Sequence, residues 1–500
     1  MSVSFNSIAP GIVAPIFAFE VNSGGQFESE SRILLVGHKT TAGTMAADAP
    51  VYAASQEAVD QLAGSHSILR DMYRRARANA PAAEIWIAAA PATGTAAQWT
   101  LTVGTIPAAG GVGTLRIAGE PIVLSVAAGA TSAQVATDLA AAISGYFDGL
   151  TRATLPFASA TSASAVVTLT AAHAGEIFAD LDLWIDTTVA GNLFTASNLT
   201  IAASVAGSGT PNLAAVLAAL ADDPFDTIVS PFADATNLGR YAATLSDTAG
   251  RWAWSRQVYG HAWTVKTDTA ANLVTAGLAL TDDRHLTMLA RIASSGDATP
   301  AWGWLAAYAA RQAVWLHDGA NGGVSRNMTG LALELVAPPR DRSKWPAYDN
   351  RDAFLRSRLS TWRVESGRVV VDKAVTAYKY NALGQPDTVF RDVQALYQLM
   401  YALRFFRARL AYEHGQKALA DENPLGAGSI STPSDIKATF VHAYEALVMR
   451  GVLENADGFA AGLVVARNAD NADRVDVKAP LDRVNPLDVI AANATLYAQF

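Results

Sequence analysis

The stretch TWRVESGRVVVDKAVTAYKYNALGQPDTVFRDVQALYQLMYALRFFRARL, residues 361–410, is the one around which the rest of the chain is organised. Its first part is rich in β-branched residues and is broken at Ser366-Gly367, which favours a strand, a tight turn and a second strand. The chain then continues extended to a Gly- and Pro-containing turn at 381–386. The pattern predicts a β-hairpin followed by a second turn.

A long helix is expected after this turn, capped at its start by Asp387 or Thr388. Apolar residues recur in it at steps of three and four, and we expect this face to pack on a core: Val389, Val393, Leu396, Met400, Leu403, Phe406 and Leu410. The opposite face is expected to meet water or a partner, and it carries Arg391, Gln394, Gln398, Arg404 and Arg407.

The region around this helix is basic. Residues 351–417 hold 12 Lys or Arg and 6 Asp or Glu in a chain whose net charge is −8. Such a face can dock on an acidic surface of another copy, bind nucleic acid or remain solvated. No recognisable nucleic-acid module accompanies it, which argues against the second possibility. Arg404, Arg407 and Arg409 are the candidate residues of a basic interface between subunits.

Composition separates this chain from most globular proteins. Only 16 % of its 500 residues are charged and 51 % are apolar, whereas about 25 % charged residues is usual. We therefore expect much of the surface to be covered by other protein. The chain contains no cysteine, which excludes disulfides, thiolate metal ligands and a cysteine nucleophile. No signal peptide or membrane-spanning segment is expected.

The order of the predicted elements indicates a multidomain α/β protein, α+β overall. Strands alternate with helices, which predicts a doubly wound α/β core, and a Thr- and Ala-rich, mostly-β domain interrupts this alternation. An α+β domain follows, and extended strands form arms at both ends, the C-terminal one from residue 484. The pattern also predicts a helix over 131–143 capped by Thr131, a helix over 238–259, a strand over 331–336 and a helix over 434–451 capped by Ser434. The expected boundaries are an N-terminal arm at 1–31, the core at 32–92 and 212–345, the inserted domain at 93–211, the C-terminal domain at 346–480 and a C-terminal arm at 481–500.

Both predicted arms are single strands without a hairpin partner nearby. A lone strand must either join a sheet of its own domain or add to the sheet of another copy, and the sequence leaves both possibilities open. The candidate inter-subunit arm residues are Ile16, Phe17, Ala18, Phe19, Val21, Val489, Ile490, Leu496 and Tyr497.

Motifs that carry chemistry are not found in the sequence. It has no Gly-rich phosphate loop followed by Lys and no nucleophile elbow. The eight histidines never occur three or four residues apart, as a helical metal site would favour. We therefore predict no catalytic, cofactor-binding or metal-binding residues and expect that the protein is not an enzyme.

Several segments, in this order, resemble the tail sheath proteins of contractile phages, closest to the Mu-like branch. They are VSFNSI at 3–8, RILLVG at 32–37, the segment 67–86, the hairpin and helix at 362–409, and LDRVNPL at 481–487 with the residues that follow. The resemblance implies an α/β core that carries an outward domain. It also implies terminal arms that add strands to sheets of neighbouring subunits around an inner tube.

The function that this resemblance implies is structural. Hexameric rings would stack into a helical sheath that contracts and drives the tube through a host envelope for genome delivery, without a cofactor. The implied partners are further copies of the chain, a tail tube protein, and baseplate and tail terminator proteins, but no nucleic acid or membrane. The protein would assemble in the host cytoplasm and reside in the phage tail. Two alternatives remain: the sheath of a headless contractile injection or secretion particle, and a nucleotide-dependent cytosolic α/β enzyme.

Overall fold

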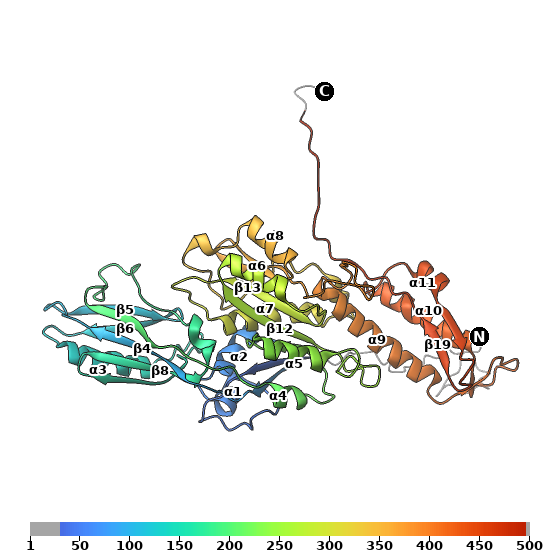
Figure 1. The fold of residues 1–500 in the computed structure, drawn as a ribbon, viewed down its shortest axis with the longest axis horizontal. Helices are drawn as coiled ribbons and strands as arrows, with labels where there is room; N and C mark the ends of the chain where they lie inside the picture. The colour runs from blue at the N-terminus through green and yellow to red at the C-terminus, as the bar shows by residue number, and fades with distance from the viewer. Residues whose placement is uncertain (1–30, 497–500) are drawn as a thin grey trace, which may run out of the picture.

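The structure is a computed structural model that describes residues 31–496. Along the long axis of Figure 1, antiparallel sheets occupy one end, a mainly parallel sheet occupies the middle, and a helical region occupies the other end; the C-terminal segment projects from the body between α8 (Tyr348–Arg356) and α11 (Ala456–Gly462). The predicted mixed α/β fold with a parallel-sheet core is confirmed. The candidate arm residues Ile16, Phe17, Ala18, Phe19, Val21 and Tyr497 lie outside the described residues.

The central sheet has the strand order β13-β12-β11-β1-β3-β2. Its strands run parallel, except that β2 is antiparallel to β3. Every residue of β11 and of β13 is buried, as in a parallel sheet that is covered on both faces. The strands are β1 (Arg32–Gly37), β2 (Val51–Tyr52), β3 (Ile85–Ala89), β11 (Phe225–Val229), β12 (His261–Asp268) and β13 (Leu286–Ile292).

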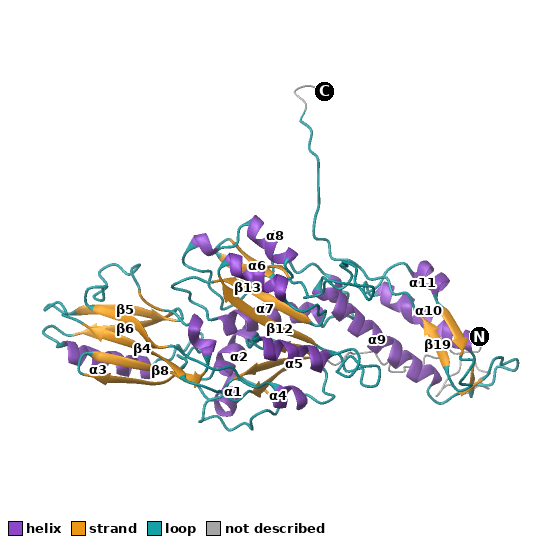
Figure 2. Cartoon of the chain, viewed as in Figure 1, coloured by secondary structure: helices purple, strands orange, loops and turns teal. Residues whose placement is uncertain are grey.

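Helices alternate with these strands, as the sequence predicted, and several surround the sheet in Figure 2. Helices α2 and α7 pack against each other beside the sheet. The helices are α1 (Gln56–Ala63), α2 (Ile68–Asn79), α4 (Ala214–Ala218), α5 (Ala235–Leu245), α6 (Ala270–Ala279) and α7 (Ala301–Leu316).

Two antiparallel sheets and one helix are formed by the region between β3 and α4. One sheet has the order β10-β4-β8-β7 and the other the order β6-β5-β9. Thr131 caps the helix by accepting a hydrogen bond from the Gln134 amide, which confirms the predicted cap. These elements are β4 (Ala96–Val103), β5 (Gly111–Ile117), β6 (Glu120–Val126), α3 (Ser132–Ser144), β7 (Phe157–Ala163), β8 (Val166–Ala174), the 3-10 helix η1 (Glu176–Asp180), β9 (Leu183–Ile185) and β10 (Leu199–Val205).

The hairpin predicted at the start of the 361–410 stretch is present. Strands β14 (Thr361–Glu365) and β15 (Arg368–Lys373) pair antiparallel around Ser366-Gly367. Trp362 is buried, and its indole N–H donates to the Ala290 carbonyl in β13 at 3.0 Å. The hairpin is thereby fixed to the central sheet through a residue that local patterning marked only as a strand position.

The long helix α9 (Val393–His414) begins later than expected, and Asp392 is its N-cap. The prediction of Asp387 or Thr388 as the cap is wrong, because residues before Asp392 are held by tertiary hydrogen bonds. The Thr376 amide donates to the Arg391 carbonyl at 2.8 Å, and Val375 forms a bridge with Asp392. The Asp387 carboxylate instead accepts from the Tyr378 hydroxyl at 2.7 Å.

Both sides of α9 are covered by protein near its N-terminal end. Gln394 and Gln398, expected on the wet face, are buried, whereas Val389, expected in the core, precedes the helix and is exposed. The amide of Gln398 donates to Ser325 Oγ at 2.7 Å and to the Val484 carbonyl at 2.8 Å. The simple division of α9 into a core face and a wet face is therefore wrong for its first turns.

Two further predictions fail for reasons of tertiary structure. The helix expected over 238–259 ends with α5 at Leu245, because the buried Arg251 guanidinium binds the carbonyls of Ala221 and Tyr259 and fixes a non-helical loop. The strand expected over 331–336 is replaced by one bridge, between Ala332 and Val370. Leu335 has a φ of 58°, which is incompatible with a continuous strand.

The remaining elements gather around α9. Helix α10 (Pro433–Met449) begins with a capping box between Thr432 and Asp435, rather than at Ser434 as predicted. Strands β18 (Val464–Arg467) and β19 (Val475–Lys478) pair antiparallel. The other elements are η2 (Gly323–Ser325), η3 (Arg342–Lys344), α8 (Tyr348–Arg356), β16 (Ala418–Leu419), β17 (Ile430–Ser431) and α11 (Ala456–Gly462).

Candidate interaction site at the C-terminal segment

Residues 482–488, called the root below, hold the C-terminal segment on the body of the protein. The Glu454 amide donates to the Asp482 carbonyl at 3.0 Å, and the Val484 amide donates to the Val452 carbonyl at 3.3 Å. The Tyr444 hydroxyl accepts from the Asp482 amide at 3.1 Å. The segment expected to be extended from residue 484 without a local partner is thus bonded to its own chain at its beginning.

Beyond Asp488 the described chain leaves the body. Figure 1 shows this end projecting away from α9 and α11, and residues 489–496 form no helix or strand. Val489, Ile490 and Leu496 are 78 %, 80 % and 98 % exposed. A segment with exposed apolar side chains and an unpaired backbone has the features of a strand that is added to the edge of another sheet. We call residues 489–500 the free segment, of which 489–496 are described.

The hairpin β18–β19 offers a sheet that could receive such a strand. It contains two strands in the part of the chain that the structure describes, so each has one unpaired edge there. Val464 is 56 % exposed and Val477 is 38 % exposed. A two-stranded sheet is only marginally stable, and a further strand would satisfy its edge amides and carbonyls.

The three candidate basic residues occupy different environments. Arg404 donates to both carboxylate oxygens of Asp226, at 2.7 and 2.6 Å, so its charge is compensated within the chain. Arg407 and Arg409 are exposed on the last turns of α9, and the Arg409 guanidinium lies 5.7 Å from the centre of the Phe405 ring. The structure therefore leaves Arg407 and Arg409 as the members of the set that face outward.

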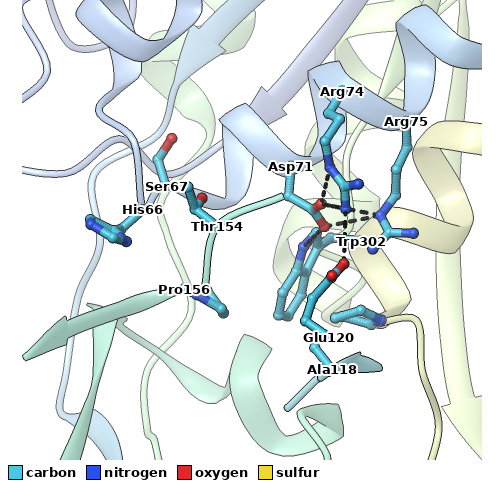
Figure 3. A pocket seen from close by; sticks show the side chains of 11 residues that line it. His66, Ser67, Asp71, Arg74, Arg75, Ala118, Glu120, Thr154, Pro156 and Trp302 are labelled. Atoms are coloured by element: carbon cyan, nitrogen blue, oxygen red, sulfur yellow. Dashed lines mark hydrogen bonds and ion pairs between the residues drawn. The ribbon is translucent and has the colours of Figure 1, made fainter. Parts of the chain in front are cut away.

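A small cavity lies between α2 and the antiparallel sheets, and several side chains that line it bind one another. Its volume is about 20 Å³, room for roughly one water molecule. Figure 3 shows Asp71 pointing at Arg74, Arg75 and Trp302. The carboxylate accepts from Arg74 at 2.8 Å, from Arg75 at 3.1 Å and from the Trp302 indole at 3.0 Å. Burial opposes ionisation of Asp71, but the two arginines outweigh it and hold its pKa well below the usual value.

Two buried histidines lie close to each other at the same junction. Their ring centres are 5.4 Å apart. His38 Nδ1 donates to the Ala90 carbonyl at 2.8 Å, and His173 Nε2 accepts from the Ile68 amide at 3.3 Å. Burial lowers the pKa of His38 to about 4 and, with the charge of His38, that of His173 to about 3. Both imidazoles are therefore neutral structural groups at neutral pH.

Within residues 31–496, no set of His, Cys, Asp and Glu side chains is placed so that it could hold a metal ion. None of the helices described there is long and apolar enough to cross a membrane.

Sequence reasoning missed the residues that hold the root. Gln398 lies in the second turn of α9, on the face expected to meet water or a partner, yet its amide donates to the Val484 carbonyl. Asn327, which donates to the Leu487 carbonyl, lies in a loop with no distinguishing motif. An amide residue inside an otherwise apolar helical window is a sequence signal that could have indicated Gln398, because such a side chain needs hydrogen-bond partners if it is buried.

The Asp71 cluster predicts a large effect of charge removal. Asp71→Asn would leave Arg74 and Arg75 without their carboxylate in a buried site, and we expect it to lower the free energy of unfolding by about 3–5 kcal/mol. Asp352→Asn, which breaks the exposed pair with Arg356, serves as the control and should change it by less than about 1 kcal/mol. Urea denaturation followed by tryptophan fluorescence measures both, and equal effects would contradict the role given to Asp71.

The neutral histidines predict loss of stability in acid. Their folded-state pKa values lie below the usual value of about 6.5, so the unfolded chain binds more protons between about pH 6.5 and about pH 4. The melting temperature should therefore fall as the pH is lowered through this range. His173→Gln keeps a hydrogen-bond acceptor and should flatten this dependence, whereas His442→Gln, at an exposed position, should not. Parallel curves for wild type and His173→Gln would refute the assignment.

The chain is similar over nearly its whole length to a known protein. No family model matches the chain. The chain is 26 % identical over 501 residues to the Mu-like prophage FluMu tail sheath protein of Haemophilus influenzae, covering 98 % of this chain and 99 % of that protein. The sequence relationship thus extends over nearly the whole of both proteins.

Solved structures of sheath proteins also resemble it. A sheath tail protein from Desulfitobacterium hafniense matches with a TM-score of 0.48 and 14 % identity, covering 94 % of this chain and 97 % of that one. One from Listeria innocua gives 0.48 and 14 %, covering 92 % and 93 %. On the full-length sequence match, the resemblance inferred from the sequence is confirmed: over nearly its whole length the chain is similar to a tail sheath protein of a Mu-like prophage.

Proposed function

We propose that this protein is a tail sheath subunit that polymerises as stacked hexameric rings around a tail tube. Contraction of the resulting sleeve drives the tube through the host envelope for genome delivery. The observation that supports the proposal most directly is the free segment, which leaves the body at Val489 with its apolar side chains exposed. In a protein that acted alone, these exposed apolar side chains would have no protein surface to pack against.

The free segment is long enough to reach another subunit. Its 12 residues, 489–500, span roughly 40 Å when extended. We propose that it adds a strand to β18–β19 of a neighbouring copy, where backbone pairing gives affinity and alternate side chains are buried. Val489, Ile490, Leu496 and Tyr497 are its proposed contacts. On sequence pattern alone, Ile16, Phe17, Ala18, Phe19 and Val21 are proposed to act in the same way at the other end.

The proposed roles of the parts of the chain follow the domain boundaries inferred from the sequence. Residues 32–92 and 212–345 form the core, 93–211 the outward inserted domain, and 346–480 the domain that joins subunits, between arms at 1–31 and 481–500. The work of contraction requires no cofactor, because it comes from two packings of the assembled subunits that differ in free energy. The proposed partners are other copies, a tail tube protein, and baseplate and terminator proteins of a phage tail.

Removal of the free segment tests the proposal. Truncation after Asp488 deletes residues without described helix or strand and should leave a folded monomer with an unchanged circular dichroism spectrum. The same protein should form no tubes in electron microscopy at concentrations at which the full chain assembles. As a control, Leu425→Ala removes an apolar side chain that is 95 % exposed in a loop of the body and should leave assembly intact. Long sleeves from the truncated protein would refute the strand-exchange mechanism.

The outward basic residues provide a second test. Reversal of Arg407 and Arg409 to Glu should weaken association of subunits by about tenfold or more at about 0.1 M salt, while the monomer keeps its melting temperature. At about 1 M salt, where charges are screened within about 3 Å, the difference in association between this variant and the unmodified protein should become smaller. Lys266→Glu with Arg342→Glu makes the same charge change on other exposed sites and should have less effect. Sedimentation measures association, and equal behaviour of the two double variants would contradict the interface.

A further inference from the structure

The carboxylate of Asp392 is surrounded by cations at the point where the root meets α9. Asp392 is the N-cap residue of α9, but its side chain accepts no capping hydrogen bond. It lies 3.0 Å from Lys373 Nζ, 3.3 Å from an Arg483 guanidinium nitrogen and 3.5 Å from one of Arg391. Burial opposes its ionisation, but these three charges outweigh burial and hold the pKa of Asp392 below its usual value. The carboxylate is thus committed to the neighbouring side chains rather than to the helix.

Lys373 connects this carboxylate to the end of the root. Its ammonium group forms an ion pair with Asp392 and another with Asp488, the last residue before the free segment. Asn327 donates to the Leu487 carbonyl beside it. Arg483 and Asp488, at the two ends of the root, are therefore both tied to one buried acid, the first directly and the second through Lys373.

The two ties differ in how easily water reaches them. The side chain of Asp392 is 7 % exposed, whereas that of Asp488 is 29 % exposed. A partly exposed ion pair is weakened by salt and can open without exposing apolar surface. Further back, Val484 is held by the Gln398 amide and by the Val452 carbonyl. Opening at Asp488, together with loss of the adjacent Asn327 hydrogen bonds to Leu487 and Asp488, would therefore stop at Val484 and release residues 485–488.

We propose that Lys373, Asp392 and Asp488 form a reversible ionic latch that sets where the C-terminal segment leaves the body. With the latch closed, the segment is free from Val489. With the latch open, residues 485–488 join it and extend its reach by roughly 13 Å. This inference rests on the proposed function, because it gives the inter-subunit arm two lengths within one subunit. A sheath that changes its packing while its strands stay paired needs such slack.

Spin labels on the unassembled full-length chain test the latch. The protein has no cysteine, so Val489→Cys and Tyr412→Cys introduce the two sites for nitroxide labels. Both positions are exposed, at 78 % and 84 %, and Tyr412 belongs to α9. The distance distribution between the labels should be narrow in the doubly labelled parent protein. In Asp488→Asn and in Lys373→Gln it should broaden by roughly 10 Å, the spread of a flexible four-residue linker.

Controls separate the latch from general loss of structure. Asp488→Glu keeps the charge and should restore the narrow distribution. Glu334→Gln breaks an exposed ion pair with Arg368, which lies on β15 as Lys373 does, and should leave the distance distribution unchanged. Raising the salt from about 0.1 M to about 1 M should broaden the distribution of the parent protein without any substitution.

The latch is overturned if Asp488→Asn and Lys373→Gln both keep the narrow distribution, or if salt does not broaden it. These measurements use unassembled protein and do not depend on sheath formation. A truncated chain that still forms tubes would refute the proposed function and leave the distance distributions unaffected. The two failures are therefore distinguishable.

Discussion

Two adjacent residues of helix α9 form hydrogen bonds on two different sides of the helix. The arrangement of the central sheet relative to the C-terminal region depends on these hydrogen bonds. The Tyr397 hydroxyl accepts from the Trp263 indole at 3.1 Å and donates to the Asp226 carbonyl at 3.1 Å, which ties the helix to β11 and β12. The next residue, Gln398, binds the Val484 carbonyl at 2.8 Å. Because adjacent residues of a helix point about 100° apart, one turn of α9 joins the core to the root of the C-terminal segment.

Buried polar groups of this kind fix relative position more than they add stability. A hydrogen bond inside the protein replaces one to water, so its net contribution is small, but an unpaired buried donor or acceptor is strongly unfavourable. The Nε2 donor of Gln398 and the carboxylate of Asp392 are both buried, and each finds partners in segments far away in the sequence. The root therefore leaves the body in a defined direction.

Much of the fold could be predicted because the signals are local. The hairpin at Ser366-Gly367, the Thr131 cap and the alternation of strands and helices each depend on residues a few positions apart. The candidate site was only partly predictable. An apolar, extended stretch without a local partner near the C-terminus indicated the free segment, but nothing in the local pattern distinguished Lys373 or Asn327 as the residues that hold its root.

The sequence by itself determined most of the elements, the absence of cysteine chemistry and the resemblance to tail sheath proteins, since propensity, periodicity and order of segments can be read along the chain. Tertiary structure decided where α9 begins, which of its polar residues are buried and which arginines face outward. Arg404 is paired with Asp226, 178 positions away, and Gln398 with Val484, 86 positions away. Such partners are chosen by which segments the folded core brings together, and no local preference encodes that choice.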